Sequence, residues 1–214
     1  MVKIINGKDL VGTINGISII SGNYPPRKTG KVRTCIPIEK VTSTTVHNTG
    51  NASKGAGARN HHQYLHNVEN SGERYVGYHF VVDDRHIIQC LPLDEATYHC
   101  GEKGNYNSIS IEICENVDMD YKKAEENAVA LIKELLRLYN ISDIKSHRDW
   151  SGKNCPHIIL PYWDDFVKRC KEGSDTKPKK LYRVQVGAFA IKDNALRLQQ
   201  ELKEKGYDAI IKEN

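Results

Sequence analysis

A histidine, a lysine and a cysteine lie together in one short stretch, residues 146–156. His147 and Cys155 offer an imidazole nitrogen and a thiolate sulfur, and a catalytic zinc takes three such protein ligands and keeps one position for water. The third ligand must come from elsewhere, and His47, which follows a run rich in threonine and valine, is the best candidate. The spacing fits no CxxC-type finger, so we do not expect a structural zinc. The sequence therefore predicts a catalytic metal site, with a chance pairing of ordinary side chains as the alternative.

Three further residues could supply the other parts of a hydrolytic reaction. Glu112 stands in an alternating stretch, where a buried carboxylate is costly unless the site needs it, so we expect it in a pocket; a solubilising role on an edge strand is the alternative. Lys153 would hold its ammonium near the metal and stabilise an oxyanion. Tyr78 could donate a hydrogen bond to that oxygen or orient the water. Together they predict metal-assisted hydrolysis of an amide, in which Glu112 takes a proton from water.

Hydrophobic periodicity predicts the elements that must position these residues. Alternating isoleucines indicate a strand that presents Glu112 on one face, and a strand rich in threonine and valine leads to His47. A helix with one apolar stripe, capped by Asp118 or Asp120, carries no catalytic residue. We expect residues 146–156 to form a loop. The expected strands are 14–20, 41–46, 78–82, 86–89, 107–114 and 141–145, and the expected helices are 58–68, 120–139 and 161–170.

Other reactive side chains have plainer explanations. His61, His62 and His66 share the 58–68 helix without the acidic residue of an HExxH arrangement, so we expect a solvated or groove-lining face. The basic stretch 23–33 could touch a substrate, but a solvated loop is the simpler expectation. Five of the six cysteines, all except Cys155, are expected to be reduced and to pack as small apolar residues.

Length and composition narrow the class of protein. The chain has 214 residues, of which 39% are hydrophobic, which suggests one medium domain and something small. The net charge of +4, from 31 basic and 27 acidic residues, gives no case for nucleic-acid binding. No apolar run is long enough to insert into a membrane, and residues 1–20 contain no signal-peptide pattern. We therefore expect a protein that is made in the cytoplasm.

Taken together, the motifs resemble those of the zinc-dependent type 2 N-acetylmuramoyl-L-alanine amidases, a family that includes phage endolysins and peptidoglycan recognition proteins. The resemblance covers about residues 30–170. It implies an α/β fold with a mixed central sheet flanked by helices, and cleavage of the bond between N-acetylmuramic acid and L-alanine of the stem peptide. The matching motifs are Val46-His47-Asn48-Thr49, Gly77-Tyr78-His79-Phe80, Ser108-Ile109-Ser110-Ile111-Glu112, Ser146-His147-Arg148-Asp149 and Lys153-Asn154-Cys155-Pro156.

The resemblance also implies a role for each matching residue, and leaves the division of work between Tyr78 and Glu112 open. Two alternatives remain: a peptidoglycan-binding protein without activity, and a zinc peptidase that acts within the stem peptide. The implied residues are the zinc ligands His47, His147 and Cys155, the catalytic Glu112, Lys153 and Tyr78, and the groove-lining His99 and Asn107.

The last part of the chain differs in composition. Residues 171–180 are polar and read as a linker between a catalytic domain, 1–170, and a tail, 181–214. The tail shows a strand near Tyr182, a helix capped by Asp193 and ended by Gly206, and a second strand over 207–211. It resembles the first half of a SPOR domain, a peptidoglycan-binding module. We expect either a truncated module or a homodimer in which two tails complete one sheet.

The absence of a signal peptide and the wall-directed tail favour one biological setting. We expect a phage or prophage endolysin that reaches the cell wall after release by a holin, rather than a secreted autolysin. Its partner would be the peptidoglycan of a bacterial wall.

Overall fold

The computed structural model describes residues 1–172, 185–207 and 209–211, and the chain divides into two compact units, Met1–Lys177 and Pro178–Asn214. The first unit is built on a mixed seven-stranded sheet, with the strand order β3-β4-β7-β6-β8-β5-β9, beside a two-stranded sheet, β1-β2. The strands are β1 (Lys3–Ile5), β2 (Asp9–Val11), β3 (Thr13–Ile14), β4 (Ile17–Ile20), β5 (Ser43–Asn48), β6 (Phe80–Val82), β7 (Ile87–Gln89), β8 (Ser108–Ile113) and β9 (Asp143–Ser146).

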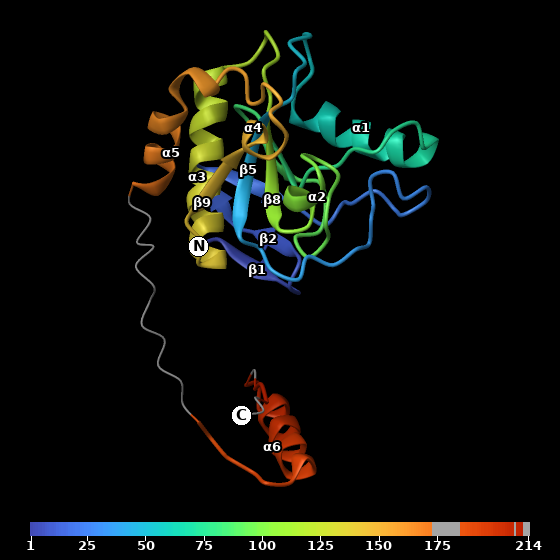
Figure 1. Cartoon of the computed structure of the whole chain (residues 1–214), viewed down its shortest axis with the longest axis vertical. Helices are drawn as coiled ribbons and strands as arrows, with labels where there is room; N and C mark the ends of the chain where they lie inside the picture. The colour runs from blue at the N-terminus through green and yellow to red at the C-terminus, as the bar shows by residue number, and fades with distance from the viewer. Residues whose placement is uncertain (173–184, 208, 212–214) are drawn as a thin grey trace. The chain divides into compact units, whose positions relative to one another are not determined.

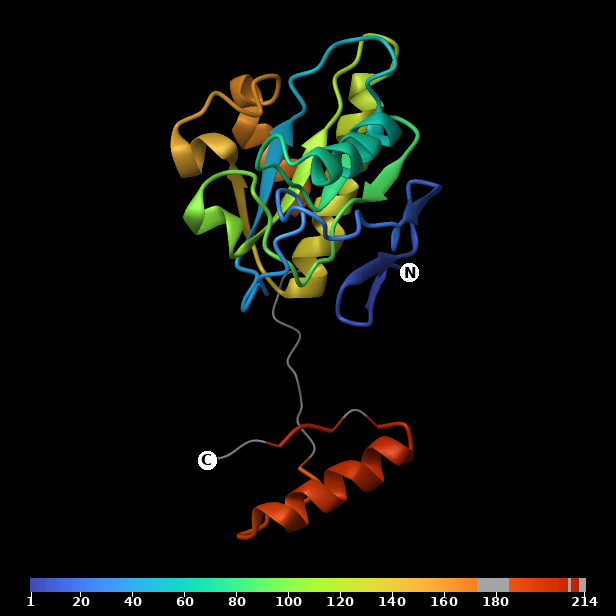
Figure 2. The same cartoon turned by 90° about the vertical axis from the view of Figure 1, so that its right-hand side faces the viewer.

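Helices cover both faces of the large sheet, as predicted (Figure 1). In Figure 2, α1 lies in front of the sheet and α3 behind it. None of the helices in the described ranges is both long and apolar enough to cross a membrane. The helices are α1 (Ala58–Ser71), α2 (Glu102–Asn105), α3 (Tyr121–Tyr139), α4 (His147–Ser151), the 3-10 turn η1 (Leu160–Tyr162), α5 (Trp163–Lys171) and, in the second unit, α6 (Lys192–Glu204).

The two faces of the sheet differ in chemistry because side chains alternate along each strand. One face carries aliphatic residues such as Ile109 and Ile111, which pack against α3 and α5 in the main core. The other face carries Val81 and Ile88 under α1, together with a polar group at its centre. That polar group, which includes Thr45, Ser108 and Ser110, is buried. Because the apolar stripe of α3 covers the aliphatic face, the candidate functional residues lie on the opposite face.

The central strands bring the two predicted functional residues of this face side by side. β5 and β8 are parallel, and their register pairs His47 with Glu112. β8 lies between β6 and β5, so the alternative of an edge strand for Glu112 is wrong. The predicted hairpin is confirmed, since β6 and β7 pair antiparallel. Paired residues on neighbouring parallel strands point to the same face, and both side chains therefore face the α1 side.

Local capping explains the ends of two helices near the sheet. Asp120 is the N-cap of α3, where its side chain accepts a bond from the backbone N–H of Lys123, so it and not Asp118 takes the predicted role. The stretch after β9 was expected to be a loop, but it begins with the short helix α4. Ser146 and Asp149 form a reciprocal capping box at its start, which satisfies free backbone N–H groups there. His147 is therefore the first residue of a helix and follows directly from a strand.

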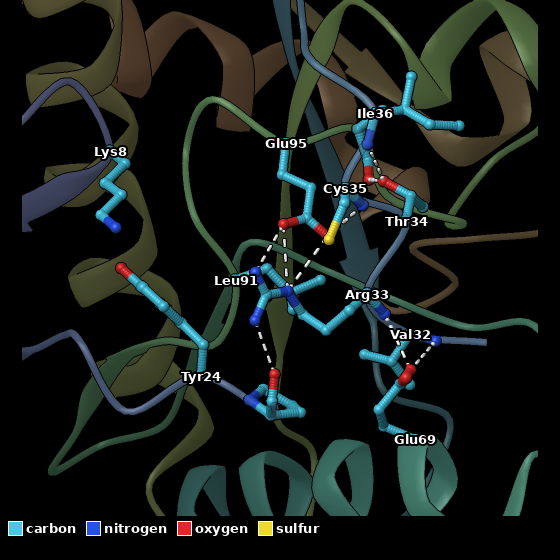
Figure 3. A network of polar contacts seen from close by, with 12 residues as sticks. Lys8, Tyr24, Val32, Arg33, Thr34, Cys35, Ile36, Glu69, Leu91 and Glu95 are labelled. Carbon is cyan, nitrogen blue, oxygen red and sulfur yellow. Dashed lines mark hydrogen bonds and ion pairs between the residues drawn. The ribbon is translucent and has the colours of Figure 1, made fainter. Parts of the chain in front are cut away.

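The basic stretch 23–33 is a loop with many exposed side chains, as expected, but its backbone is held in place by two carboxylates. Glu69 of α1 accepts hydrogen bonds from five backbone N–H groups of residues 28–33, at 2.6–3.0 Å. Arg33 forms an ion pair with Glu95 at 2.9 Å and donates to the Pro25 carbonyl. Figure 3 shows Glu69 and Glu95 reaching this stretch from opposite sides. Two buried carboxylates therefore hold the loop in one conformation.

Glu69 provides a test of this arrangement. Burial alone would raise its pKa, but the backbone N–H donors outweigh it and lower the pKa to about 2. The ionised form therefore stabilises the fold above the usual carboxyl pKa of 4.5, and this stabilisation is lost as the pH falls toward 2. We expect Glu69→Gln to lower the free energy of unfolding by roughly 2–4 kcal/mol at pH 7. Urea unfolding at pH 7 and at pH 3 measures the free energy of unfolding of both proteins. If the free energies of Glu69→Gln and the wild type differed by the same amount at both pH values, the role of the ionised carboxylate would be contradicted.

Cysteine packing follows the expectation with one exception. All six cysteines are free, and five of them are buried. Cys35 is exposed, so the expectation that it packs as an apolar residue is wrong. It lies at a positive φ of 54°, within the loop held by Glu95, and its backbone N–H donates to that carboxylate at 2.9 Å. Backbone hydrogen bonding, not burial of the side chain, determines the conformation at this position.

The second unit contains the predicted helix but not the second predicted strand. α6 ends before Gly206, whose positive φ of 83° suits the residue after a helix. Asp193 lies in the first turn, and the N-cap is Ile191 instead. The described residues of 207–211 form no strand, because a strand needs a hydrogen-bonded neighbour. The first predicted strand, near Tyr182, lies mostly outside the described residues.

Candidate metal centre

Three residues that are far apart in the sequence meet at the ends of β5 and β9. His47 Nδ1 lies 3.1 Å from His147 Nδ1 and 3.7 Å from Cys155 Sγ, and the three ligand atoms all lie within 4.8 Å of one another. A tetrahedral zinc with ordinary bond lengths would hold two imidazole nitrogens about 3.3 Å apart, and a nitrogen and a sulfur about 3.6 Å apart. The donor set and its spacing therefore fit a single zinc ion.

Burial prepares the two histidines for metal binding. It lowers the pKa of His47 well below 6.5, an effect increased by His99, His147 and Lys153. Burial and the charge of Lys153 lower the pKa of His147 to about 4. Both rings are therefore neutral at pH 7, the form that coordinates a metal. Burial and the charge of Glu112 raise the pKa of Cys155 to about 11, so its thiolate form depends on a bound cation.

Neighbouring elements hold the ligand loop against the sheet. The Asn48 side chain, next to His47 on β5, accepts a bond from the backbone N–H of Ile158 at 3.1 Å and donates to the Tyr121 hydroxyl at 3.0 Å. The backbone N–H of Arg148 donates to the Cys155 carbonyl at 3.1 Å. These bonds connect β5, α3 and both ends of the loop, so the positions of His147 and Cys155 depend on rigid elements.

Glu112 is half-buried and pairs with His47 in the register of β8 and β5. Its Oε2 atom is buried and has no hydrogen-bond partner among the described residues. Burial raises its pKa to about 8, although the charge of Lys153 acts in the opposite direction. A buried carboxylate without a partner is costly, and such groups are characteristic of functional sites. The geometry therefore suits Glu112 as an acid or base near neutral pH.

Lys153 lies at the exposed side of the centre, whereas Tyr78 lies in the interior. Lys153 is exposed, and its charge acts on Glu112, both histidines and Cys155, so it lies at the open side of the centre. Tyr78 is buried, and its hydroxyl donates to the backbone carbonyl of His61 at 2.7 Å. That bond uses the proton that the sequence assigned to substrate or water. In this arrangement Tyr78 joins α1 to the sheet.

His99 is partly exposed and contacts His47, one of the three candidate metal ligands. Its Nδ1 atom lies 3.0 Å from His47 Nε2, the nitrogen that would remain free when His47 Nδ1 binds a metal. On its other side, His99 Nε2 lies 3.4 Å from Ser108 Oγ, which donates to the Gly104 carbonyl. Thr45 joins Ser108 to the indole N–H of Trp150. The ring is thus the middle of a partly buried chain of hydrogen-bonding groups next to the centre.

Asn107 does not lie where its expected groove-lining role would place it, and Asn105, to which the sequence assigned no role, supports the segment of His99 instead. Asn107 precedes β8 and lies at the opposite end of that strand from Glu112, so the structure does not bring it to the centre. Asn105 instead accepts hydrogen bonds from the backbone N–H groups of His99 and Cys100, at 2.9 and 3.0 Å. Sequence reasoning missed Asn105 because nothing in the pattern separates two asparagines on either side of one tyrosine.

The remaining histidines of α1 stay outside the centre. His62 Nε2 donates a hydrogen bond to the Asn23 carbonyl at 2.7 Å, and His66 Nε2 lies 3.3 Å from His62 Nε2. Among the described residues, the only group of three or more histidine, cysteine or acidic side chains with metal-binding geometry is His47, His147 and Cys155. The expectation that the helix histidines form no metal site is consistent with this geometry.

Comparison with known families identifies the family to which this chain belongs. Residues 38–158 match the family model described as N-acetylmuramoyl-L-alanine amidase, and this match covers more than half of the chain. The chain therefore belongs to the N-acetylmuramoyl-L-alanine amidase family. Residues 176–214 match the model of the SPOR domain.

Individual relatives agree with this family. The chain is 44% identical over 141 residues to the N-acetylmuramoyl-L-alanine amidase CwlH of Bacillus subtilis, a match that covers 63% of this chain and 54% of CwlH. It is 47% identical over 127 residues to the amidase XlyA of the same organism, which covers 57% of this chain and 41% of XlyA. The chain thus matches only about half the length of these curated relatives.

Solved structures show the same fold. The catalytic domain of XlyA superposes with a TM-score of 0.64 at 39% identity and covers 72% of this chain and 99% of that domain. The PlyG catalytic domain superposes with a TM-score of 0.63 at 34% identity and covers 76% of this chain and 99% of that domain. The predicted mixed sheet flanked by helices is confirmed.

Proposed function

We propose that this chain cleaves the amide bond between N-acetylmuramic acid and L-alanine in peptidoglycan, and that it does so with zinc. The observation that carries the proposal is the meeting of His47, His147 and Cys155 within 4.8 Å, next to the unpartnered Glu112. Membership of the amidase family supports the choice of substrate. The expectation of a phage-type enzyme is supported by the similarity to a structure titled as a mutant endolysin from Bacillus subtilis, at 40% identity.

Zinc is the metal that the donor set favours, because two imidazoles and one thiolate suit a tetrahedral ion with one open position. When bound, the ion would supply a Lewis acid and lower the pKa of water. The chain's own residues determine the rest. His47 and His147 are neutral near pH 7 and need not lose a proton on binding.

Glu112 and Lys153 divide the remaining chemistry in this proposal. Glu112 takes the proton from the attacking water and passes it to the amine that leaves, because its raised pKa of about 8 suits proton exchange near neutral pH. Lys153, at the open side, holds its ammonium toward the oxygen that gains negative charge in the transition state. Tyr78 acts through α1, not on the substrate, because its hydroxyl is bonded to His61.

The proposed reaction is tested by the products from a purified cell wall. Amidase activity releases new N-terminal L-alanine on intact stem peptides and leaves complete glycan strands. New amino termini of other residues would indicate a peptidase within the stem peptide, and new reducing sugar ends would indicate a glycosidase. Binding to the wall without any product would indicate a recognition protein. The last three outcomes each contradict the proposal.

We further propose that His99 positions His47 by fixing its tautomer. A metal-bound histidine usually donates its second N–H to an outer group, and loss of that group lowers metal affinity by roughly 10–100-fold. Here the acceptor would be His99 Nδ1, 3.0 Å from His47 Nε2. We expect His99→Phe, which keeps a ring but no acceptor, to weaken zinc binding by roughly tenfold or more. His66→Phe, on the outer part of α1, is the matched control.

Competition with a coloured chelator measures this zinc affinity directly, without reference to activity. Unchanged zinc affinity in His99→Phe would contradict the positioning role and return His99 to the groove-lining role expected from the sequence. An equal loss in His66→Phe would show that the effect is not specific to the contact with His47.

The tail supports two finer proposals. We propose that residues 181–214 bind peptidoglycan, because residues 176–214 match a SPOR domain, and that two tails pair in a homodimer. Several apolar side chains of the tail are exposed, among them Val186, Phe189 and Ile210, and a partner would cover them. A monomer mass in light scattering at high protein concentration would rule out the dimer.

Release through a holin is proposed for the endolysin setting, and lysis that is independent of a holin would contradict it.

A further inference from the structure

Three tyrosines and two basic residues form a surface cluster beside the metal centre. They come from separate segments: Arg27 and Lys31 from the loop held by Glu69, Tyr75 from the stretch after α1, Tyr98 from the stretch before α2, and Tyr106 from the end of α2. We call these five residues the tyrosine–cation patch. The sequence alone did not connect them, because no two of the tyrosines are close in the chain.

Side-chain contacts hold the patch together. The rings of Tyr75 and Tyr98 meet edge to face, with centroids 5.0 Å apart, and the Lys31 ammonium lies 3.6 Å from the centre of the Tyr75 ring. Burial and the neighbouring Tyr106 and Tyr75 raise the pKa of Tyr98, while the charges of Lys31 and Arg27 lower it. Tyr98 therefore lies within electrostatic reach of the other four side chains, and Tyr75 contacts both Tyr98 and Lys31.

The backbone beneath the patch is equally well defined. The N–H of Val76 donates to the Lys31 carbonyl at 3.1 Å, and the N–H of Gly77 donates to the Tyr98 carbonyl at 2.9 Å. The loop that carries Arg27 and Lys31 is fixed by the five bonds to Glu69, of which Figure 3 shows those from Val32 and Arg33. The patch is therefore a preformed surface, and binding there would cost little ordering.

The patch is next to the proposed centre. Tyr98 directly precedes His99, whose Nδ1 lies 3.0 Å from His47 Nε2. Tyr106 directly follows Asn105, which binds the backbone N–H groups of His99 and Cys100. The segments that contain His99 and Asn105 thus support His47 in the interior and carry Tyr98 and Tyr106 at the surface. A peptide substrate bound at the centre would therefore reach the patch within a few of its own residues.

The charges indicate what the patch would bind. The nearby carboxylates of Glu69 and Glu95 are already used by backbone N–H groups and by Arg33. No ion pair within the described part of the chain involves Arg27 or Lys31. Tyr75 is 61% and Tyr106 43% exposed, so their rings and hydroxyls are open to a ligand. Two cations beside exposed aromatic rings favour an extended chain that carries carboxylates and amides.

We propose that the tyrosine–cation patch binds the acidic stem peptide of peptidoglycan, with Arg27 and Lys31 paired to its carboxylates and the tyrosines packed along its backbone. This inference rests on the proposed function for the substrate, and adds which part of that substrate lies on which surface. The neutral glycan would gain nothing from the two cations, and it is therefore not the occupant that the charges favour.

Binding of defined fragments to the full chain tests the proposal. The probes are the N-acetylated peptide L-Ala-γ-D-Glu-L-Lys-D-Ala, whose two carboxylates outweigh its one ammonium group, the same peptide with its carboxylates amidated, and tri-N-acetylchitotriose. We expect the double variant Arg27→Gln/Lys31→Gln to bind the acidic peptide roughly fivefold more weakly than wild type. The amidated peptide should bind wild type and variant equally weakly. Lys122→Gln/Lys123→Gln, two exposed lysines of α3 on the other side of the sheet, is the charge-matched control.

Three outcomes would overturn the proposal: equal peptide affinity in both double variants, undiminished binding of the amidated peptide, or loss of chitotriose binding in place of peptide binding. Thermal melting of each variant checks that the fold is intact. Cell-wall digestion separates this proposal from the proposed function. If the wild type releases no alanine but Arg27→Gln/Lys31→Gln still binds the peptide more weakly than the wild type, only the proposed activity is overturned. If Arg27→Gln/Lys31→Gln keeps the amidase activity, the KM and the peptide affinity of the wild type, only the proposed role of the patch is overturned.

Discussion

Replacing Glu112 by Gln is expected to lower kcat for cell-wall hydrolysis by roughly 10³-fold, within the range typical for loss of a general base. The change keeps the size of the side chain and removes only its ability to exchange a proton. Glu112 pairs with His47 in the sheet register, and its Oε2 atom is buried without a hydrogen-bond partner among the described residues. Release of N-terminal alanine from purified wall measures the effect.

The zinc content of Glu112→Gln distinguishes loss of the general base from loss of the metal. Glu112 is not one of the three ligand residues, so Glu112→Gln should retain the zinc content of the wild type. Glu126→Gln, an exposed glutamate on α3, is the control and should keep full activity. Retained wild-type activity in Glu112→Gln would refute the assigned role, and loss of zinc in that variant would mean that the carboxylate holds the centre together.

Replacing Cys155 by Ser should remove the metal and the activity together. Serine has nearly the same size, but its hydroxyl is a far poorer zinc ligand than a thiolate, which the ion keeps deprotonated. We expect zinc affinity to fall by more than roughly 100-fold, beyond the loss caused by changes in outer groups. Chelator competition and alanine release measure both quantities on the same sample.

The chain offers a matched control for the thiol. Cys35 is exposed and free, so Cys35→Ser removes a sulfur without touching the centre and should leave zinc affinity unchanged. If Cys155→Ser bound zinc as tightly as wild type, Cys155 could not be a ligand. If it lost zinc but kept its activity, the metal would have no part in the reaction.

The position of the centre could be predicted because strand patterns are short-range and strict. Alternation of Ile109, Ile111 and Ile113 fixed the face of Glu112, and the run of threonine and valine placed His47 at the same edge of the sheet. The three ligand residues were therefore predictable without knowledge of the packing. Their distances were not, because they depend on α4, whose capping box by Ser146 and Asp149 follows a strand without any apolar periodicity.

The surroundings of the centre could not be predicted, since they depend on contacts between distant segments. Nothing in the composition of residues 28–33 shows that Glu69 will bind five of their N–H groups. The contact of His99 with His47, and the choice of Asn105 over Asn107, likewise arise only when α2 and β5 are brought together. The strand predicted over 207–211 is not formed by the described residues there, and strand formation depends on hydrogen bonds to a neighbouring strand, which the pattern of one segment does not reveal.

Zinc stoichiometry, combined with anomalous diffraction at the zinc edge, tests the central claim most directly. The account predicts one zinc per chain, with a single anomalous peak about 2.0–2.3 Å from His47 Nδ1, His147 Nδ1 and Cys155 Sγ. A metal-free protein that still releases alanine from cell wall, or a peak bound by other side chains, would contradict it.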